Sequence, residues 1–91
     1  MKFENFEQAK ETVGFIKEKQ RELERIDEVR RDFESEDFST SLRITNFETK
    51  NSQSATWIDI DDGHLIDIVL DKRREMVVTM IGNAMKKLET L

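Results

Sequence analysis

The first third of the chain carries apolar residues at the spacing of an amphipathic helix. From about residue 5 to residue 34 they recur every three, four or seven positions, which places them on one helical face. These apolar positions are Phe6, Ala9, Val13, Ile16, Leu23, Ile26 and Phe33. Asn5, followed three residues later by Gln8, is typical of an N-cap with a capping box, so the helix is predicted to begin there.

The predicted first helix is long and strongly charged. About thirty helical residues would span about 45 Å, which is more than one small core can cover. Acidic and basic residues follow each other at spacings of three or four, so Glu22 is expected to pair with Arg25 within the helix. Asp27 and Arg31 are expected to pair in the same way. The apolar residues repeat with a period slightly shorter than 3.6 residues, which indicates left-handed packing against another helix. Gln20 and Asp27, however, are polar residues at positions expected in the contact seam, and they argue against an extended coiled coil.

The centre of the chain changes to the two-residue period of β-strands. Segments of about 38–47 and 55–60 alternate apolar and polar side chains. The polar stretch 48–54 between them, with Asn51 and Ser52 at its centre, is typical of a turn. Together these segments predict a β-hairpin.

A hairpin centred at Asn51 sets a definite register. The predicted cross-strand pairs are Leu42 with Ile60, Arg43 with Asp59, Ile44 with Ile58, and Thr45 with Trp57. This register gathers four aliphatic side chains on one face and an oppositely charged pair on the other, which supports it. Trp57 and Phe47 then lie on the face away from the aliphatic residues, where they are candidates for contact with a partner.

Helical spacing returns in the last third of the chain, and a second long helix is predicted over about 62–89. Its apolar positions are Ile66, Val69, Leu70, Val77, Met80, Ile81, Ala84, Leu88 and Leu91. Asp61 and Asp62 stand at its start, where carboxylates offset the positive end of the helix dipole. One alternative stays open, in which residues 64–70 form a third strand and Asp71 caps a shorter helix.

Two further features of the second helix have both a structural and a functional interpretation. Met76, Met80 and Met85 are predicted to fill the core, although flexible methionine side chains also suit a binding surface. The basic run from Lys72 to Arg74 lacks interleaved aromatic residues. It is therefore predicted to form ion pairs with the acidic first helix rather than to bind nucleic acid.

Composition narrows the class of protein. The chain has 91 residues, of which 38% are charged, with a net charge of −5, no cysteine and one histidine. A single domain, 1–91, is therefore predicted, without disulfides, a zinc-thiolate site or a cysteine nucleophile. No apolar segment approaches the length that a membrane span or a signal peptide needs, so a cytoplasmic location is expected.

The densest group of polar side chains lies at the start of the second helix. Asp59, Asp61, Asp62 and His64 leave a divalent-cation site open, because carboxylates and imidazole are suitable ligands. Their spacing does not match a calcium-binding loop, and helix capping accounts for acids at these positions. No glycine-rich phosphate loop and no catalytic constellation accompanies them, so neither an enzyme nor a cofactor is predicted.

The sequence thus predicts an α+β fold of the order helix, strand, strand, helix, in which two antiparallel helices cover the aliphatic face of the hairpin. Such a chain leaves apolar surface exposed, so we expect a small, acidic, non-enzymatic module that self-associates as a homodimer or tetramer. Its size and shape are those of accessory proteins of bacteria and phages. The predicted contact residues are Phe47, Trp57, Ile16, Leu23, Val77 and Met80.

One alternative function is an acidic inhibitor or nucleic-acid mimic. The carboxylates of residues 4–37 would then bind a basic groove on another protein. With either function, neither a membrane nor a nucleic acid is expected as a partner, because the chain is acidic and lacks an apolar span.

Overall fold

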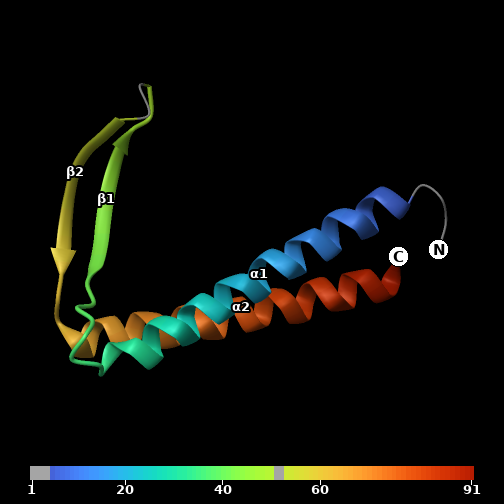
Figure 1. The fold of residues 1–91 in the computed structure, drawn as a ribbon. Coiled ribbons are helices and arrows are strands. Elements are labelled where there is room, and N and C mark those ends of the chain that lie inside the picture. The colour runs from blue at the N-terminus through green and yellow to red at the C-terminus, as the bar shows by residue number, and fades with distance from the viewer. Residues whose placement is uncertain (1–4, 51–52) are drawn as a thin grey trace.

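The computed structural model describes residues 5–50 and 53–91, which form two helices and two strands (Figure 1). The elements are α1 (Phe6–Phe33), β1 (Leu42–Glu48), β2 (Gln53–Ile60) and α2 (Gly63–Thr90). The predicted order of helix, strand, strand, helix is confirmed. The alternative third strand at 64–70 is wrong, because these residues form the first turns of α2. The predicted turn centre at Asn51 and Ser52 lies outside the described residues.

Helices α1 and α2 run antiparallel, as predicted, and bury a narrow seam between them (Figure 1). Among the described residues, the buried apolar side chains are Ala9, Ile16, Ile26, Ile66, Val77 and Ala84. Thr12 is buried as well, and its hydroxyl donates a 2.8 Å hydrogen bond to the carbonyl of Gln8, so burial leaves it paired. A seam of this size is a thin core for two helices of 28 residues each.

The two helices begin differently. Asp62 has extended backbone angles, φ −65° and ψ 108°, and its carboxylate accepts a 3.1 Å hydrogen bond from the Leu65 amide, so it caps α2. Asn5 has helical angles, φ −90° and ψ −7°, and its side chain makes no capping hydrogen bond. The capping box predicted for Asn5 and Gln8 is therefore wrong. A residue already in the helical region does not direct its side chain back to the amides of the first turn.

This difference predicts unequal costs for the same substitution at the two helix starts. Asp62→Ala is expected to lower the free energy of unfolding by about 1 kcal/mol, since it removes a cap hydrogen bond and a favourable charge. Asn5→Ala is expected to cost much less, because no capping bond is lost. Urea denaturation monitored by circular dichroism gives the free energy of unfolding of both variants. An equal decrease in the two variants would contradict the assignment of the caps.

The β-hairpin has the predicted register. The observed pairs include Leu42 with Ile60, Arg43 with Asp59, Ile44 with Ile58, and Thr45 with Trp57. Between Asn46 and Phe47 the register shifts, because β2 contributes one extra residue and forms a bulge. Strand β1 begins at Leu42 rather than at Phe38. In this register residues 38–41 would need residues 61–64 as partners, and those residues start α2.

The hairpin stands apart from the helices. Figure 1 shows it crossing the direction of the helix pair at the end where α1 finishes and α2 begins. Contacts between elements lie almost entirely within the helix pair and within the hairpin. The prediction that the helices cover the aliphatic face is therefore wrong. Only Asp61 and Asp62 link β2 to α2, and a link this short leaves the hairpin no slack to fold back over the helices.

The described chain is consequently extended. Its Cα radius of gyration is 17.6 Å, and its principal dimensions are 51 × 37 × 19 Å. A compact domain of this length would have a radius of gyration of about 12 Å. Much of the chain therefore lies on the surface rather than in a core.

Gly63 permits a close approach between the end of α1 and the start of α2. A Cβ atom at this position would lie 3.1 Å from Cζ of the Phe33 ring. The Phe33 ring therefore fills the place that a larger side chain would take. This contact lies next to the hairpin, where α1 ends and α2 begins.

Candidate interaction surface

One face of the β-hairpin is aliphatic and uncovered. Ile44 and Ile58 lie opposite each other and are 51% and 56% exposed. Leu42 and Ile60, nearer the helices, are half-buried. A two-stranded hairpin without a covering layer is at best marginally stable in water. This face is therefore suited to contact with another protein surface.

The opposite face of the hairpin carries aromatic residues. Trp57 and Phe47 are 56% and 64% exposed. The guanidinium of Arg43 lies over the Trp57 ring, 5.7 Å from its centroid, and donates hydrogen bonds of 2.8 Å and 3.2 Å to the two carboxylate oxygens of Asp59. These hydrogen bonds lower the pKa of Asp59 and raise the pKa of Arg43. An exposed tryptophan with an arginine held over it has the composition of an interface hot spot.

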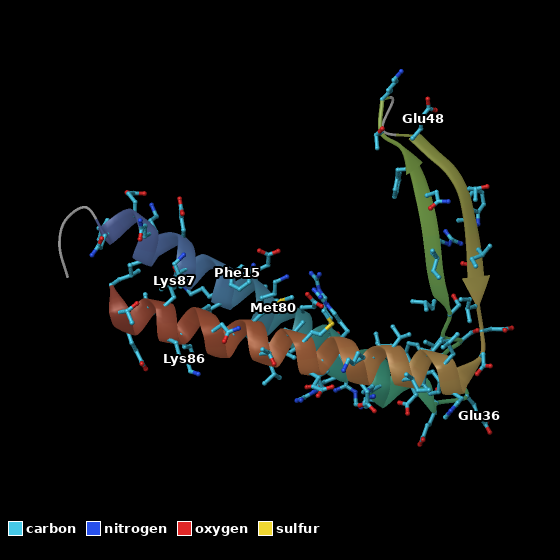
Figure 2. All side chains as sticks on the ribbon, turned by 180° about the vertical axis from the view of Figure 1, so that it is seen from behind. Phe15, Glu36, Glu48, Met80, Lys86 and Lys87 are labelled. Atoms are coloured by element: carbon cyan, nitrogen blue, oxygen red, sulfur yellow. The ribbon has the colours of Figure 1, made fainter. Side chains whose placement is uncertain are left out.

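Two adjoining grooves lie along one face of the helix pair of α1 and α2. A groove of about 480 Å³ lies between the first half of α1 and the second half of α2, and it is lined by Glu11, Thr12, Phe15, Met80, Asn83, Ala84 and Lys87. A second hollow of about 330 Å³ shares Met80 with the first and continues along α2, lined also by Lys72, Glu75, Met76 and Thr79. These residues together are called the groove face. In Figure 2, Phe15, Met80 and Lys87 lie together along the helix pair, whereas Lys86 points away from them.

Apolar side chains of the groove face reach solvent. Phe15 is 39% exposed, and the Lys19 ammonium lies 5.5 Å from the centroid of its ring. Met76 is 46% exposed, and Met80 is half-buried. The prediction that the methionines fill the core is therefore wrong for Met76, and also for Met85, which is 48% exposed. The seam is too narrow to cover side chains on the flanks of α2.

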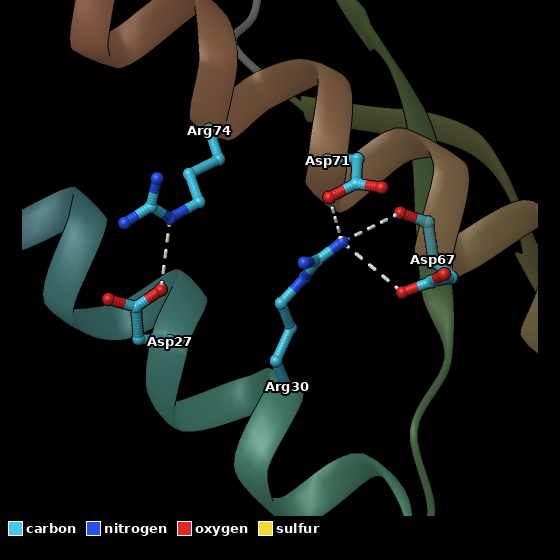
Figure 3. Close-up of polar contacts among 5 residues, drawn as sticks. All are labelled: Asp27, Arg30, Asp67, Asp71 and Arg74. Atoms are coloured by element: carbon cyan, nitrogen blue, oxygen red, sulfur yellow. Dashed lines mark hydrogen bonds and ion pairs between the residues drawn. The ribbon is translucent and has the colours of Figure 1, made fainter.

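A group of ion pairs joins the helices near the hairpin. Arg74 donates a 3.2 Å hydrogen bond to the Asp27 carboxylate (Figure 3). Arg30 contacts the carboxylates of both Asp67 and Asp71, and also donates a 3.2 Å hydrogen bond to the backbone carbonyl of Asp67. Exposed pairs of this kind each contribute at most about 1 kcal/mol. They join residues near the end of α1 to residues in the first half of α2.

Two residues of the basic run of α2, Arg73 and Arg74, pair with α1, as predicted, whereas Lys72 pairs with Glu75 within α2. Glu22 accepts a 3.0 Å hydrogen bond from Nη2 of Arg73, and this bonding lowers the pKa of Glu22. Within the described residues, Glu22 and Asp27 thus find their arginines on α2, and the pairs predicted with Arg25 and Arg31 inside α1 are wrong. Arginines of α2 reach these carboxylates across the seam, so the packing of the helices decides the pairing.

The predicted contact residues separate into two groups. Phe47 and Trp57 are exposed on the hairpin. The others lie in or beside the seam of the same chain, where Ile16 and Val77 are buried and Leu23 and Met80 are half-buried. Phe15 was not predicted, because it falls one residue away from the apolar stripe of α1. An aromatic residue directly beside such a stripe is the signal that would have identified it.

The described residues contain no group of three or more His, Cys, Asp or Glu side chains placed to hold a metal ion. Of the acids considered for a cation site, Asp59 is bound to Arg43, and Asp62 caps α2. Neither of the two described helices has a stretch that is long and apolar enough to cross a membrane. No family model, curated protein or solved structure matches the chain. The surface itself is therefore the basis for a functional assignment.

Proposed function

We propose that this chain is a non-enzymatic, self-associating protein-interaction module whose working form is a homodimer or a tetramer. The observation that carries this proposal is the amount of surface. The chain exposes 7641 Å², whereas a compact protein of 10.8 kDa exposes about 5,500 Å². The excess of about 2,100 Å² is close to what each subunit of an obligate homodimer buries.

The character of the exposed surface supports the same proposal. In the described part of the chain, fifteen large hydrophobic side chains are exposed, against six buried apolar residues. Large apolar side chains exposed in this number on a small protein support a role in contact with another protein surface. Trp57 and Phe47 on the hairpin are among the most exposed of these side chains, so both are included in the proposed contact surface.

The cellular setting forms part of the proposal. The absence of cysteine suits a reducing compartment, where disulfides do not form, and we assign the module to the cytoplasm. Its size and extended shape are in keeping with an accessory protein of a bacterium or a phage.

The acidic inhibitor or nucleic-acid mimic has less support. Glu22 and Asp27, two of the carboxylates on which it would rely, are bound to Arg73 and Arg74 of the same chain. A basic partner would have to compete with these arginines. Self-association needs no such exchange of partners.

The molar mass in solution tests the proposed function. Light scattering at micromolar concentration is expected to give two or four times the chain mass of 10.8 kDa. Trp57 is the only tryptophan, so its fluorescence reports on the hairpin, and its emission is expected to shift to shorter wavelength as the protein assembles. A mass of one chain, with Trp57 emission independent of concentration, would contradict the proposal.

A further inference from the structure

We infer that the groove face is where a second copy of the chain binds, in a four-helix dimer whose two-fold axis runs along the helices. This inference rests on the proposed function and adds the surface and the orientation. The groove face offers exposed Phe15 and Met76 on both sides of half-buried Met80, over two adjoining hollows. When the helix pairs of two copies pack through their groove faces, they form a four-helix bundle with a closed core.

The opposite side of the helix pair is less suited to a second copy. Arg74 is two residues before Met76, and two residues on a helix differ by about 200°, so Arg74 lies on the far side of α2 from the groove face. That side carries the ion pair of Arg74 with Asp27, and Arg30 joins Asp67 and Asp71 nearby (Figure 3). Covering ion pairs requires removal of their water, which costs free energy. The groove face carries a pair of this kind as well, between Lys72 and Glu75, but it also offers Phe15 and Met76, and covering these two side chains releases free energy.

Charge determines the orientation of the two copies. Glu11 on α1 and Lys87 on α2 line the same groove, so they stand at about the same height along the helix pair. A two-fold axis along the helices keeps every residue at its height and lays α1 of one copy on α2 of the other. Glu11 of each copy then faces Lys87 of its partner. An axis that crosses the helices at the groove would lay α1 on α1 and place Glu11 against Glu11, which is repulsive.

The same axis brings complementary apolar groups together. Phe15 and Met80 line one groove from opposite helices, so the axis places Phe15 of one copy against Met80 of the other. Contact between a methionine sulfur and an aromatic ring is favourable. The excess of about 2,100 Å² per chain given above is the area available for such a contact. Both hairpins lie at the same end of such a dimer.

Two exposed methionines provide a matched test of the surface. Met76 and Met85 lie on the same helix and are 46% and 48% exposed, but Met85 is outside the groove face. Met76→Glu is expected to weaken self-association at least 100-fold in sedimentation equilibrium, while Met85→Glu leaves it within about threefold. A dimer unaffected by Met76→Glu would overturn the groove face as the interface. A wild-type chain that is itself monomeric would overturn the proposed function as well, so the two failures are distinguishable.

Spin labels on the otherwise unchanged chain test the orientation. The sequence has no cysteine, so Glu36→Cys introduces a single labelling site beside the hairpin (Figure 2). An axis along the helices is expected to hold the two labels of a dimer within about 30 Å, since helix layers lie about 10 Å apart. An axis across the helices would separate them by more than about 40 Å, the length of one helix, and would overturn the inferred orientation.

A charge exchange gives an independent measure of the same contact. Lys87→Glu is expected to weaken the dimer about tenfold, and combining it with Glu11→Lys is expected to restore most of the loss. Lys86→Glu makes the same change of charge one residue away, where the side chain points away from the groove, and is expected to change the affinity less than threefold (Figure 2). Equal effects of Lys86→Glu and Lys87→Glu, with no rescue by Glu11→Lys, would count against the pairing of Glu11 with Lys87.

Discussion

Val77→Asp is expected to abolish the folded helix pair. Val77 has no exposed surface and lies in the seam between α1 and α2. A carboxylate placed there has no partner and loses its water, which costs about 3–5 kcal/mol. A single small core supplies stability of the same order, about 3–5 kcal/mol, so one buried charge consumes it. The helical signal in circular dichroism at 20 °C is expected to fall to that of an unfolded chain.

The neighbouring residue provides the control. Val78 is also a valine of α2, but it is 47% exposed. Val78→Asp makes the same chemical change and alters the helix propensity of α2 by the same small amount, so its expected cost is below about 1 kcal/mol. If Val78→Asp unfolds the chain as completely as Val77→Asp, the seam is not the principal source of stability. If neither variant unfolds, the helices do not pack as described.

The thermal midpoint is expected to rise with protein concentration. An assembled state gains stability by mass action, whereas the unfolding of a monomer is independent of concentration. With an unfolding enthalpy of about 0.7 kcal/mol per residue in each chain of a dimer, a hundredfold increase in concentration raises Tm by about 8 °C. Scanning calorimetry or circular dichroism from about 1 to about 100 µM covers the necessary range.

The Met85→Glu and Met76→Glu variants make this measurement specific. Met85→Glu is expected to retain the rise in Tm. Met76→Glu, whose side chain lies in the groove face, is expected to show a low Tm that does not change with concentration. A wild-type Tm that is constant over the whole range would mean that the seam and the hairpin are stable without a second copy.

Local patterns predicted the elements and the register of the hairpin well. The alternation around Ile44 and Ile58 fixes which residues lie opposite each other, because a shift by one position would expose every aliphatic residue of one strand on the wrong face. Asp62 was identified as a helix start because its charge and its short side chain suit that position. Both predictions depend on residues only a few positions apart in the sequence or directly across a turn.

The predictions that failed depend on how separate elements meet. The alternation of residues 38–41 is typical of a strand, but their partners in the register are used to start α2. The periodicity of a helix identifies its apolar face but not the element that packs against that face. The helices were therefore predicted to cover the hairpin, and in the structure they pack against each other instead. The close contact of Gly63 with Phe33 likewise joins residues that no spacing rule connects.

The candidate surface was predicted in part for the same reason. Trp57 and Phe47 were identified because strand alternation alone places them away from the aliphatic face. Phe15 was not identified, and Met76 was predicted as core with a binding surface only as the alternative, since the exposure of both depends on how wide a strip of each helix the other one covers. With only one neighbour, each helix buries a narrow line of side chains, and residues on its flanks that would be core in a larger bundle stay at the surface.

The beginning of α1 and the end of α2 lie next to each other, far from the hairpin (Figure 1). This placement has a mechanical consequence. A load applied through these two ends acts across the open end of the helix pair, so it peels α1 from α2 a few side chains at a time instead of shearing the whole seam at once. The hairpin joins the helices at the opposite end and carries no tension until the seam has opened along its full length. Loads transmitted through the chain therefore test the helices first, while the strands keep their pairing.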